Sequence, residues 1–355
     1  MDEHVIGVSA HLAEIARARE LDAAGRHDDA INELATAAQR GDVEATTQLA
    51  KRIIVGDRAP RLREQGIGLL RDAVKMGGAE AAERLAVIVA AGGAGPPDWP
   101  TALRLLVLAA ERGWGPARGQ LEVLASMSGP LQRPTSSGSP SAIIESTDIR
   151  KLLAPPAGSV IHADPKICTF PAFLSAQACD WLIERARGRL ERARVYDAFT
   201  HADFVDESRT NSSAMFNIME ADLVHMLVQA RMAPACGLPV NHMEAATVLH
   251  YAVGETIGNH YDFVDPAHPG YAEEISKFGN RAVTFLVYLN AGYEGGETVF
   301  PRVGVSHAGQ RGEGLFFVNT LDDGQANLRA LHNGQPPTRG EKWVFSQFVR
   351  NRPWS

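Results

Sequence analysis

The stretch TVLHYAVGETIGNHYD, residues 247–262, joins a strand-like run to a histidine and an aspartate that lie two positions apart. Thr247–Tyr251 is rich in β-branched and aromatic residues and is followed by turn residues, which is typical of a β-strand. Similar runs are found at Ala282–Leu289, Gly314–Val318 and Trp343–Val349. Several short strands without intervening helices predict a β-sandwich or an open barrel.

His260 and Asp262 are candidate metal ligands, because two imidazoles and one carboxylate form the ligand set of non-haem Fe(II) with open coordination positions. A single His-x-Asp motif is weak evidence, and this chain has three of them. One begins at His162, before the predicted strands, and another at His201, in a polar, loop-like stretch. Only His260 follows a strand-like run and precedes a β-rich region with a distant histidine, so we expect the metal there.

The third ligand has to come from another strand, and the downstream candidates are His268, His307 and His332. His268 lies in a loop with prolines and a glycine, too near the first pair to close a facial triad from across a barrel. His307 has no cation at a useful distance on a following strand. His332 is followed by Lys342 at the start of the last predicted strand, and we therefore expect His332 to complete the Fe(II) site.

Lys342 is the candidate cation for an organic co-substrate. Period-two alternation places Lys342, Val344, Ser346 and Phe348 on one face of the last strand. If that face points inward, the buried ammonium needs an anion, and the distal carboxylate of 2-oxoglutarate would supply it. An exposed lysine at a strand edge is the alternative.

Residues 1–125 repeat a pattern every 36 positions. Gly41, Gly77 and Gly113 align, and each separates two helix-like runs, which predicts helix–turn–helix units that resemble tetratricopeptide-like repeats. Such units stack to bury their apolar faces. They serve either as a docking surface for a protein partner or a second subunit, or as a structural cap, and the sequence leaves both interpretations open. The matching apolar columns are Ile31/Ile67/Leu103, Leu34/Leu70/Leu106, Ala45/Ala81/Ala117 and Leu49/Leu85/Leu121.

Composition limits the class of protein. Residues 126–145, rich in Ser, Pro and Gly near their start, predict a linker between a repeat domain at 1–125 and a second domain at 146–355. The net charge of −7 offers no basic surface for nucleic acid. The start lacks a signal-peptide pattern, and the longest apolar stretch, near Leu85–Gly95, is too short to span a membrane. Three cysteines without metal-type spacing favour free thiols, so we expect a cytoplasmic protein.

From about Ile167 to Trp354 the chain resembles the prolyl-4-hydroxylase branch of the 2-oxoglutarate/Fe(II) dioxygenases. The matching segments are Tyr251, His260-Tyr261-Asp262, Arg281-Ala282-Val283-Thr284 with Tyr288-Leu289-Asn290, Gly295-Gly296-Glu297-Thr298-Val299-Phe300-Pro301, and His332 through Gly340-Glu341-Lys342-Trp343. The resemblance implies a double-stranded β-helix, or jelly-roll, domain. The whole chain is then of the α+β class, with the helical repeats followed by this oxygenase domain.

The resemblance also implies the roles of individual residues. Iron would be bound by His260, Asp262 and His332, and the distal carboxylate of 2-oxoglutarate by Lys342. The same co-substrate pocket would be lined by Tyr251, Thr284 and Tyr288. Fe(II), 2-oxoglutarate and O2 are the expected cofactors and co-substrates, with ascorbate in support, and succinate and CO2 are the expected co-products.

The substrate is predicted from two arginines and a loop. Arg281 lies at the mouth of the strand that carries Thr284, where a guanidinium could bind an amino-acid carboxylate bidentately, and Arg209 is a weaker second candidate. A surface arginine paired with an acid is the alternative for Arg281. Residues 263–279, with two prolines and two glycines, form either a lid over the site or a connecting loop.

We expect the substrate to be a free cyclic amino acid, such as proline or pipecolic acid, hydroxylated on a ring carbon in natural-product biosynthesis. A prolyl hydroxylase that acts on a peptide or protein is the alternative, and the repeats favour it because such repeats often hold peptides. A third possibility is an adaptor whose repeats carry the function while the oxygenase domain is non-catalytic. The complete set of predicted ligands argues against this adaptor.

Overall fold

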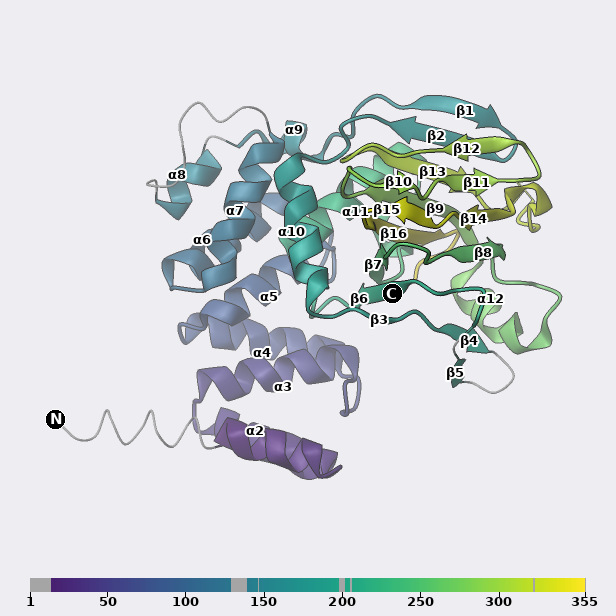
Figure 1. Cartoon of the computed structure of the whole chain (residues 1–355). Helices are drawn as coiled ribbons and strands as arrows, with labels where there is room; N and C mark the ends of the chain where they lie inside the picture. Colours follow the sequence, from purple (N-terminus) through teal and green to yellow (C-terminus); the bar gives the residue numbers. More distant parts are fainter. Residues whose placement is uncertain are drawn as a thin grey trace. The chain divides into compact units, whose positions relative to one another are not determined.

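The computed structural model describes residues 14–128, 139–145, 147–197, 202–204, 206–321 and 323–354 (Figure 1). They form two compact units. One unit holds the helices up to Ala125, the short helix α8 and the segment Asn217–Leu223, and the other holds Asp148–Phe216 and the chain from Val224 onward. No helix among these residues is long and apolar enough to cross a membrane. The predicted domain limits, 1–125 and 146–355, stay a prediction. Asn217–Leu223 lies within the predicted second domain but is part of the first unit.

The first unit confirms the predicted helical repeats. Residues 14–23 are helical, and six further helices follow as three pairs (Figure 1). Gly41, Gly77 and Gly113 lie in the turns within the pairs at φ of +87°, +104° and +86°, a backbone conformation that favours glycine. The predicted apolar columns are buried, with the exception of the half-buried Ile31. The pairs are α2 (His27–Gln39) with α3 (Val43–Val55), α4 (Arg63–Lys75) with α5 (Ala79–Ala90), and α6 (Trp99–Glu111) with α7 (Gly115–Met127).

Asn217–Leu223 is built into this helical unit by polar contacts with α5 and α7. Arg84 on α5 donates hydrogen bonds to the backbone oxygens of Met219 (2.5 Å) and Ala221 (2.8 Å). Gln120 on α7 accepts a bond from the backbone nitrogen of Leu223 at 3.0 Å. Met219 packs in the apolar cluster formed by α3, α4 and α5. The helical unit is therefore assembled from two distant parts of the sequence.

The predicted linker is only partly within the described residues. Its residues 129–138 lie outside them, whereas Pro140–Glu145 form helix α8. Ser139 accepts a hydrogen bond from the backbone nitrogen of Ala142 at 3.3 Å, and Pro140 occupies the first position of the helix, where proline is well tolerated. A helix therefore forms where we expected irregular chain. The next helix is α9 (Ile149–Leu153).

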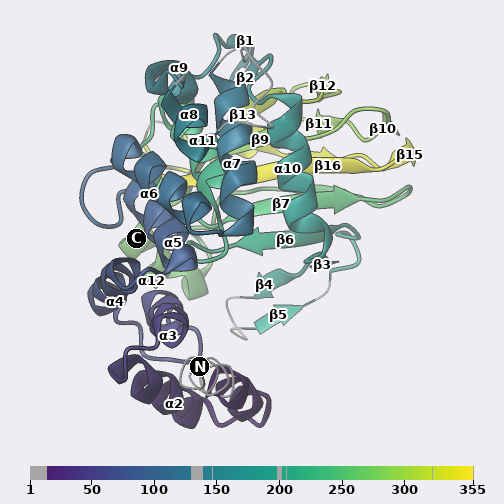
Figure 2. The same ribbon diagram turned by 90° about the vertical axis from the view of Figure 1, so that its left-hand side faces the viewer.

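The second unit is built on an eight-stranded antiparallel sheet. Helix α10 (Ala176–Arg187), capped by Ser175, contacts β6 and β7 (Figure 2). Helix α11 (Leu223–Cys236) is joined to β16 by a hydrogen bond between Gln229 and Gln347 of 2.8 Å. The order of strands is β1 (Ser159–Ala163), β2 (Lys166–Phe170), β13 (Gly314–Val318), β9 (Arg281–Tyr288), β16 (Lys342–Arg350), β7 (Ala246–Tyr251), β6 (Ser212–Phe216) and β3 (Glu191–Arg192).

A second, four-stranded sheet shares an apolar core with the large one. Leu286 and Tyr288 of the large sheet and Phe300 of the small sheet belong to the same buried cluster. The small sheet has the order β12 (Val305–His307), β11 (Thr298–Phe300), β14 (His332–Gly334) and β8 (Ile257–His260). The remaining elements are β4 (Val195–Asp197) with β5 (Ala202–Phe204), β10 (Glu294–Gly295) with β15 (Pro337–Arg339), η2 (Val240–His242), η3 (Pro269–Tyr271), α12 (Ala272–Phe278) and η4 (Leu328–Ala330). Two antiparallel sheets packed in this way confirm the predicted jelly-roll architecture and the α+β class.

Candidate active site

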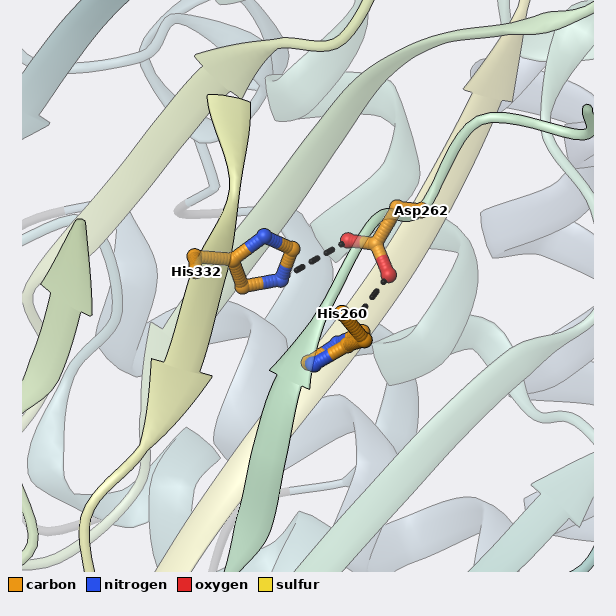
Figure 3. A group of neighbouring side chains, drawn as sticks. All are labelled: His260, Asp262 and His332. Carbon is orange, nitrogen blue, oxygen red and sulfur yellow. Dashed lines mark ion pairs between the residues drawn. The ribbon is translucent and has the colours of Figure 1, made fainter. Parts of the chain in front are cut away.

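The small sheet places His260 and His332 directly opposite one another. His260 is the last residue of β8, His332 is the first residue of β14, and the antiparallel register pairs them. Cross-strand neighbours of this kind lie within reach of each other's side chains. The two imidazole centroids are 4.2 Å apart (Figure 3). Histidines seventy-two positions apart in sequence are thus brought together, as the prediction of the third ligand requires.

Asp262 completes the cluster two residues beyond His260. One carboxylate oxygen lies 3.4 Å from Nε2 of His260, and the other lies 3.3 Å from Nε2 of His332 (Figure 3). One ligand atom from each of the three residues falls within 4.8 Å of the others. Burial acts to raise the pKa of the Asp262 carboxyl, but the two histidines hold that pKa well below its usual range. The carboxylate is therefore anionic and available to a cation.

Backbone carbonyls orient both imidazoles. Nδ1 of His260 is 2.8 Å from the oxygen of Gly258, and Nδ1 of His332 is 3.0 Å from the oxygen of Ala330. A hydrogen bond to a carbonyl fixes the proton on Nδ1, so each Nε2 presents its lone pair. Both lone pairs point to the side where Asp262 lies. This donor set, two imidazole nitrogens and one carboxylate with no other ligand from the described residues, fits Fe(II) with open positions.

Thr284 and Asn319 support the carboxylate from the large sheet. Thr284 donates a hydrogen bond of 2.7 Å to Asp262, and Asn319 donates one of 2.9 Å to the Thr284 hydroxyl oxygen. We predicted that Thr284 lines the co-substrate pocket, whereas its observed partner is Asp262; its contact with 2-oxoglutarate stays a prediction. Asn319 was missed, although it follows Leu315 and Phe317 on the same face of a strand-like run and is polar where they are apolar.

Lys342 is a buried cation with a neutral partner. Only 2% of its surface is exposed, and Nζ donates a hydrogen bond of 2.7 Å to the backbone oxygen of Gly296. Burial lowers the pKa of the ammonium to about 8, and the negative charge of Glu297 only partly opposes this. No carboxylate of the described residues lies within ion-pair distance of Nζ. Desolvated ammonium groups require an anion, so this site fits the distal carboxylate of 2-oxoglutarate.

The rings of Tyr251 and Tyr288 both lie near this ammonium. Nζ of Lys342 is 5.0 Å from the ring centroid of Tyr251 and 5.6 Å from that of Tyr288. The Tyr288 hydroxyl donates a hydrogen bond of 2.9 Å to Thr298. Burial raises the pKa of both phenols, so they remain neutral donors at physiological pH. The structure thus gathers the predicted tyrosines around Lys342.

Arg281 is already engaged by an acid. Its Nε and Nη2 donate hydrogen bonds of 2.8 Å each to the two oxygens of Glu244, and the guanidinium carbon lies 3.9 Å from the ring centroid of Phe348. This pairing matches the alternative that we gave for Arg281. The predicted binding of a substrate carboxylate would have to use the remaining donors of the guanidinium.

Arg209 has no acidic partner among the described residues. Its Nε donates a long hydrogen bond of 3.4 Å to Asn211, and its backbone bridges to Ile257 at the start of β8. This bridge joins Arg209 to β8, the strand that ends at His260. Arg209 is therefore the freer of the two predicted substrate cations.

The histidines that we set aside lie in other settings. His162 approaches the backbone oxygen of Pro165 at 3.0 Å, His268 accepts a hydrogen bond from Gly270, and His307 lies 3.3 Å from Glu313. His201 lies outside the described residues. The His-x-Asp motif at His162 does not bring its two side chains to a common partner. His162 approaches Pro165, whereas Asp164 accepts a hydrogen bond from Asn327.

Comparison with known proteins agrees with this geometry. A model of the 2OG-Fe(II) oxygenase superfamily matches residues 246–350, a span that holds every predicted site residue except Arg209. Probable prolyl 4-hydroxylase 9 of Arabidopsis thaliana is 29% identical over 210 residues, which cover 54% of this chain and 71% of the relative. Probable prolyl 4-hydroxylase 6 of the same plant is 30% identical over 206 residues, which cover 53% of this chain and 70% of the relative.

Among solved structures, the chain is similar to the viral collagen prolyl hydroxylase of Paramecium Bursaria Chlorella virus-1 in its complex with 2OG. The TM-score is 0.41 and the identity 25%, and the match covers 52% of this chain and 95% of the viral one.

Proposed function

This chain belongs to the prolyl 4-hydroxylase family of 2-oxoglutarate/Fe(II) oxygenases, and from that premise we propose that it hydroxylates a prolyl residue of a peptide or protein. It is a dioxygenase that uses Fe(II), 2-oxoglutarate and O2. Together they supply the oxidant that converts a C–H bond into C–OH, while 2-oxoglutarate is split into succinate and CO2. The protein's own contribution is to bind, orient and shield the reactants.

The predicted metal ligands and Lys342 bind different reactants. We assign Fe(II) to His260, Asp262 and His332, which leave coordination positions open for the reactants. We assign the distal carboxylate of 2-oxoglutarate to Lys342, whose ammonium has no acidic partner among the described side chains. The buried Tyr251 and Tyr288 beside it exclude water, and Tyr251 offers its hydroxyl group to the same carboxylate, since that of Tyr288 donates to Thr298. This buried, unneutralised Lys342 is the observation that supports the co-substrate assignment.

The pairing of Arg281 favours a polypeptide substrate over a free amino acid. Glu244 occupies one edge of the guanidinium and neutralises its charge, so a second carboxylate would face Glu244 as well as Arg281. A peptide presents neutral carbonyl oxygens instead, and these can accept hydrogen bonds from the remaining Arg281 donors without charge repulsion. The names of the relatives, prolyl 4-hydroxylases, support the same substrate class.

A free cyclic amino acid is the second candidate, and Arg209 supports it. Its backbone pairs with β8, the strand that ends at His260, and its guanidinium has no acidic partner among the described residues, so it could bind an amino-acid carboxylate. Proline and pipecolic acid fit this description. In that case the enzyme would make a hydroxylated amino acid of the kind used in natural-product biosynthesis.

Mass spectrometry distinguishes the two candidates. Reactions would contain Fe(II), 2-oxoglutarate and ascorbate, with free proline, free pipecolate or a proline-containing peptide in separate tubes. We expect one added oxygen on the peptide alone, and no addition with the His260→Ala variant. Addition to a free amino acid, abolished by Arg209→Gln, would instead support the second candidate. Binding of a partner by the repeats and a cytoplasmic location remain predictions.

A further inference from the structure

The two ends of the segment between Asp262 and β9 are joined by hydrogen bonds of one side chain, that of Asn280. Asn280 accepts a hydrogen bond from the backbone nitrogen of Val264 (2.7 Å) and donates one to its oxygen (2.8 Å). Helices η3 and α12 lie between these two points (Figure 1). The segment we expected as a lid or a loop therefore leaves and rejoins the sheet at one site, two residues from a metal ligand.

Arg350 ties α12 to the end of the large sheet. This last residue of β16 is fully buried, and each nitrogen of its guanidinium has a different acceptor. Nη2 donates to Glu274 of α12, and Nη1 donates to the backbone oxygen of Gly279 at 2.8 Å. Nε donates to Glu244 at 2.6 Å. One side chain thus contacts the helix, its C-terminal turn and the carboxylate of Glu244.

That carboxylate is the one that holds Arg281. A single oxygen of Glu244 accepts from Nε of both Arg281 and Arg350, at 2.8 and 2.6 Å. Burial acts to lower the pKa of Arg281, but Glu244, Asp262 and Glu274 together raise it. Glu274 therefore influences Arg281 although no hydrogen bond joins them. Glu274 contacts Arg350, Arg350 contacts Glu244, and Glu244 contacts Arg281; we call these four side chains the network.

The cluster contains two guanidinium groups and two carboxylates, so its charges balance. Buried ion pairs are sensitive to the loss of one partner, because the remaining charge stays without compensation. If Glu274 loses its charge, Arg350 is left with Glu244 as its only anionic partner among these four groups and competes more strongly with Arg281 for it. Loss of the charge on α12 then alters the position of Glu244, the residue that orients Arg281.

We propose that Arg350 is a positioning residue that couples α12 to Arg281, so that the segment at residues 263–279 sets the orientation of the guanidinium at the substrate mouth. The role assigned to Arg281 rests on the proposed function, whereas the coupling itself is a property of the fold. The proposal makes α12 a determinant of substrate binding rather than a connecting loop.

The helix offers a matched pair of variants for the test. Glu274→Gln removes the charge that Arg350 contacts, whereas Glu273→Gln removes an exposed charge one position earlier that has no ion pair within the described part of the chain. Arg281→Lys, at the other end of the network, keeps the charge but loses the two-pronged contact with Glu244. Together they perturb the network from both ends.

Hydrogen–deuterium exchange of the full-length protein measures the coupling without any substrate. We expect Glu274→Gln and Arg281→Lys each to accelerate exchange of the α12 amides about fivefold, and Glu273→Gln to leave them unchanged. Acceleration by Arg281→Lys is the decisive result, because this residue does not touch α12 through any hydrogen bond of the described residues. If α12 exchanges at the original rate in Arg281→Lys, the coupling is absent.

Steady-state kinetics with the peptide substrate adds the functional consequence. We expect Glu274→Gln to raise the KM for the peptide about fivefold, because only substrate orientation is affected, while kcat and the KM for the co-substrate stay the same. Equal peptide KM values for Glu274→Gln and Glu273→Gln would overturn the proposal. If the unaltered enzyme hydroxylates no peptide or amino acid, the proposed function fails, and the exchange experiment still decides the coupling.

Discussion

Lys342 is the residue whose chemistry follows most directly from its surroundings. Its folded pKa of about 8 lies below the ordinary value of 10.5, because burial disfavours the charged form. The ammonium is therefore present below about pH 8 and is lost as the pH rises through that value. Bound 2-oxoglutarate would stabilise the charged form and raise this pKa, so binding near pH 8 is expected to take up a proton.

We expect the affinity for 2-oxoglutarate to be constant below this pKa and to fall about tenfold per pH unit well above it, since only the ammonium form pairs with the carboxylate. Calorimetry at pH 7, 8 and 9 in buffers of different ionisation enthalpy would measure both the affinity and the proton uptake. Lys342→Met should bind weakly at every pH. An affinity of the unaltered protein that stays constant to pH 9 would contradict the assignment.

Thr284 allows a test of how Asp262 is held. Thr284→Val keeps the shape of the side chain but removes the hydroxyl that donates to the carboxylate. Loss of such a supporting contact typically costs about 10- to 100-fold in metal affinity. Anaerobic titration with Fe(II) would measure this loss, with Thr247→Val on strand β7 as the control. Equal affinities of the two variants would show that the hydroxyl has no part in binding.

Alternation along strands was enough to predict several residues of the site, but not their polar partners. Lys342 was expected on an inward face, and it is buried. Glu244, in contrast, lies 37 positions from Arg281 and is brought to it by pairing between distant strands. Arg350 ends a strand, where a charged residue is ordinarily expected to be exposed, yet it is fully buried and donates to acceptors on three other residues, Glu244, Glu274 and Gly279. Such long-range partners leave no periodic signal.

At the level of elements, the loop between β12 and β13 is packed tightly against β9. A Cβ atom on Gly309 would lie 2.0 Å from the Tyr288 ring, which is far too close. Gly309→Ala should therefore displace Tyr288 and raise the KM for the co-substrate, with an overpacking cost of about 1–3 kcal/mol. Gly188→Ala is the matched control, because nothing lies within 4 Å of its added Cβ.

Enzyme kinetics and thermal denaturation of the two glycine variants check this prediction. We expect Gly188→Ala to resemble the unaltered protein in both measurements. If Gly309→Ala does the same, Tyr288 has room to move and does not define the co-substrate pocket.

Helices with a strong sequence period were predictable, whereas short ones were not. The glycine-marked repeats correspond to three helix pairs, because each pair buries the same columns of apolar residues. Helix α12 was expected as loop, since its seven residues follow a stretch with two prolines and carry only a weak apolar pattern. It is held instead by tertiary contacts such as that between Glu274 and Arg350.

At the level of the whole molecule, the helical unit depends on a segment that the linker prediction assigned to the other domain. Met219 is buried among residues of α3, α4 and α5, whereas Met215, four positions earlier on β6, is 62% exposed. We expect Met219→Ala to destabilise the helical unit by about 2–5 kcal/mol, and Met215→Ala to have little effect. Hydrogen exchange of α4 and α5 in the full chain would show the difference. Equal exchange in both variants would mean that this segment does not contribute to the unit.

The position of Asn217–Leu223 also bears on how the protein is made. A ribosome delivers α2 to α7 first, yet the backbone groups that Arg84 and Gln120 bind emerge only after β1 to β6 have been synthesised. Until then, Arg84 and Gln120 lack these backbone partners and keep their contacts with Glu83, and the apolar surface that Met219 covers is open to other chains. We therefore expect the need for a chaperone to be greatest in the interval after the repeats have been synthesised and before Asn217–Leu223 has emerged.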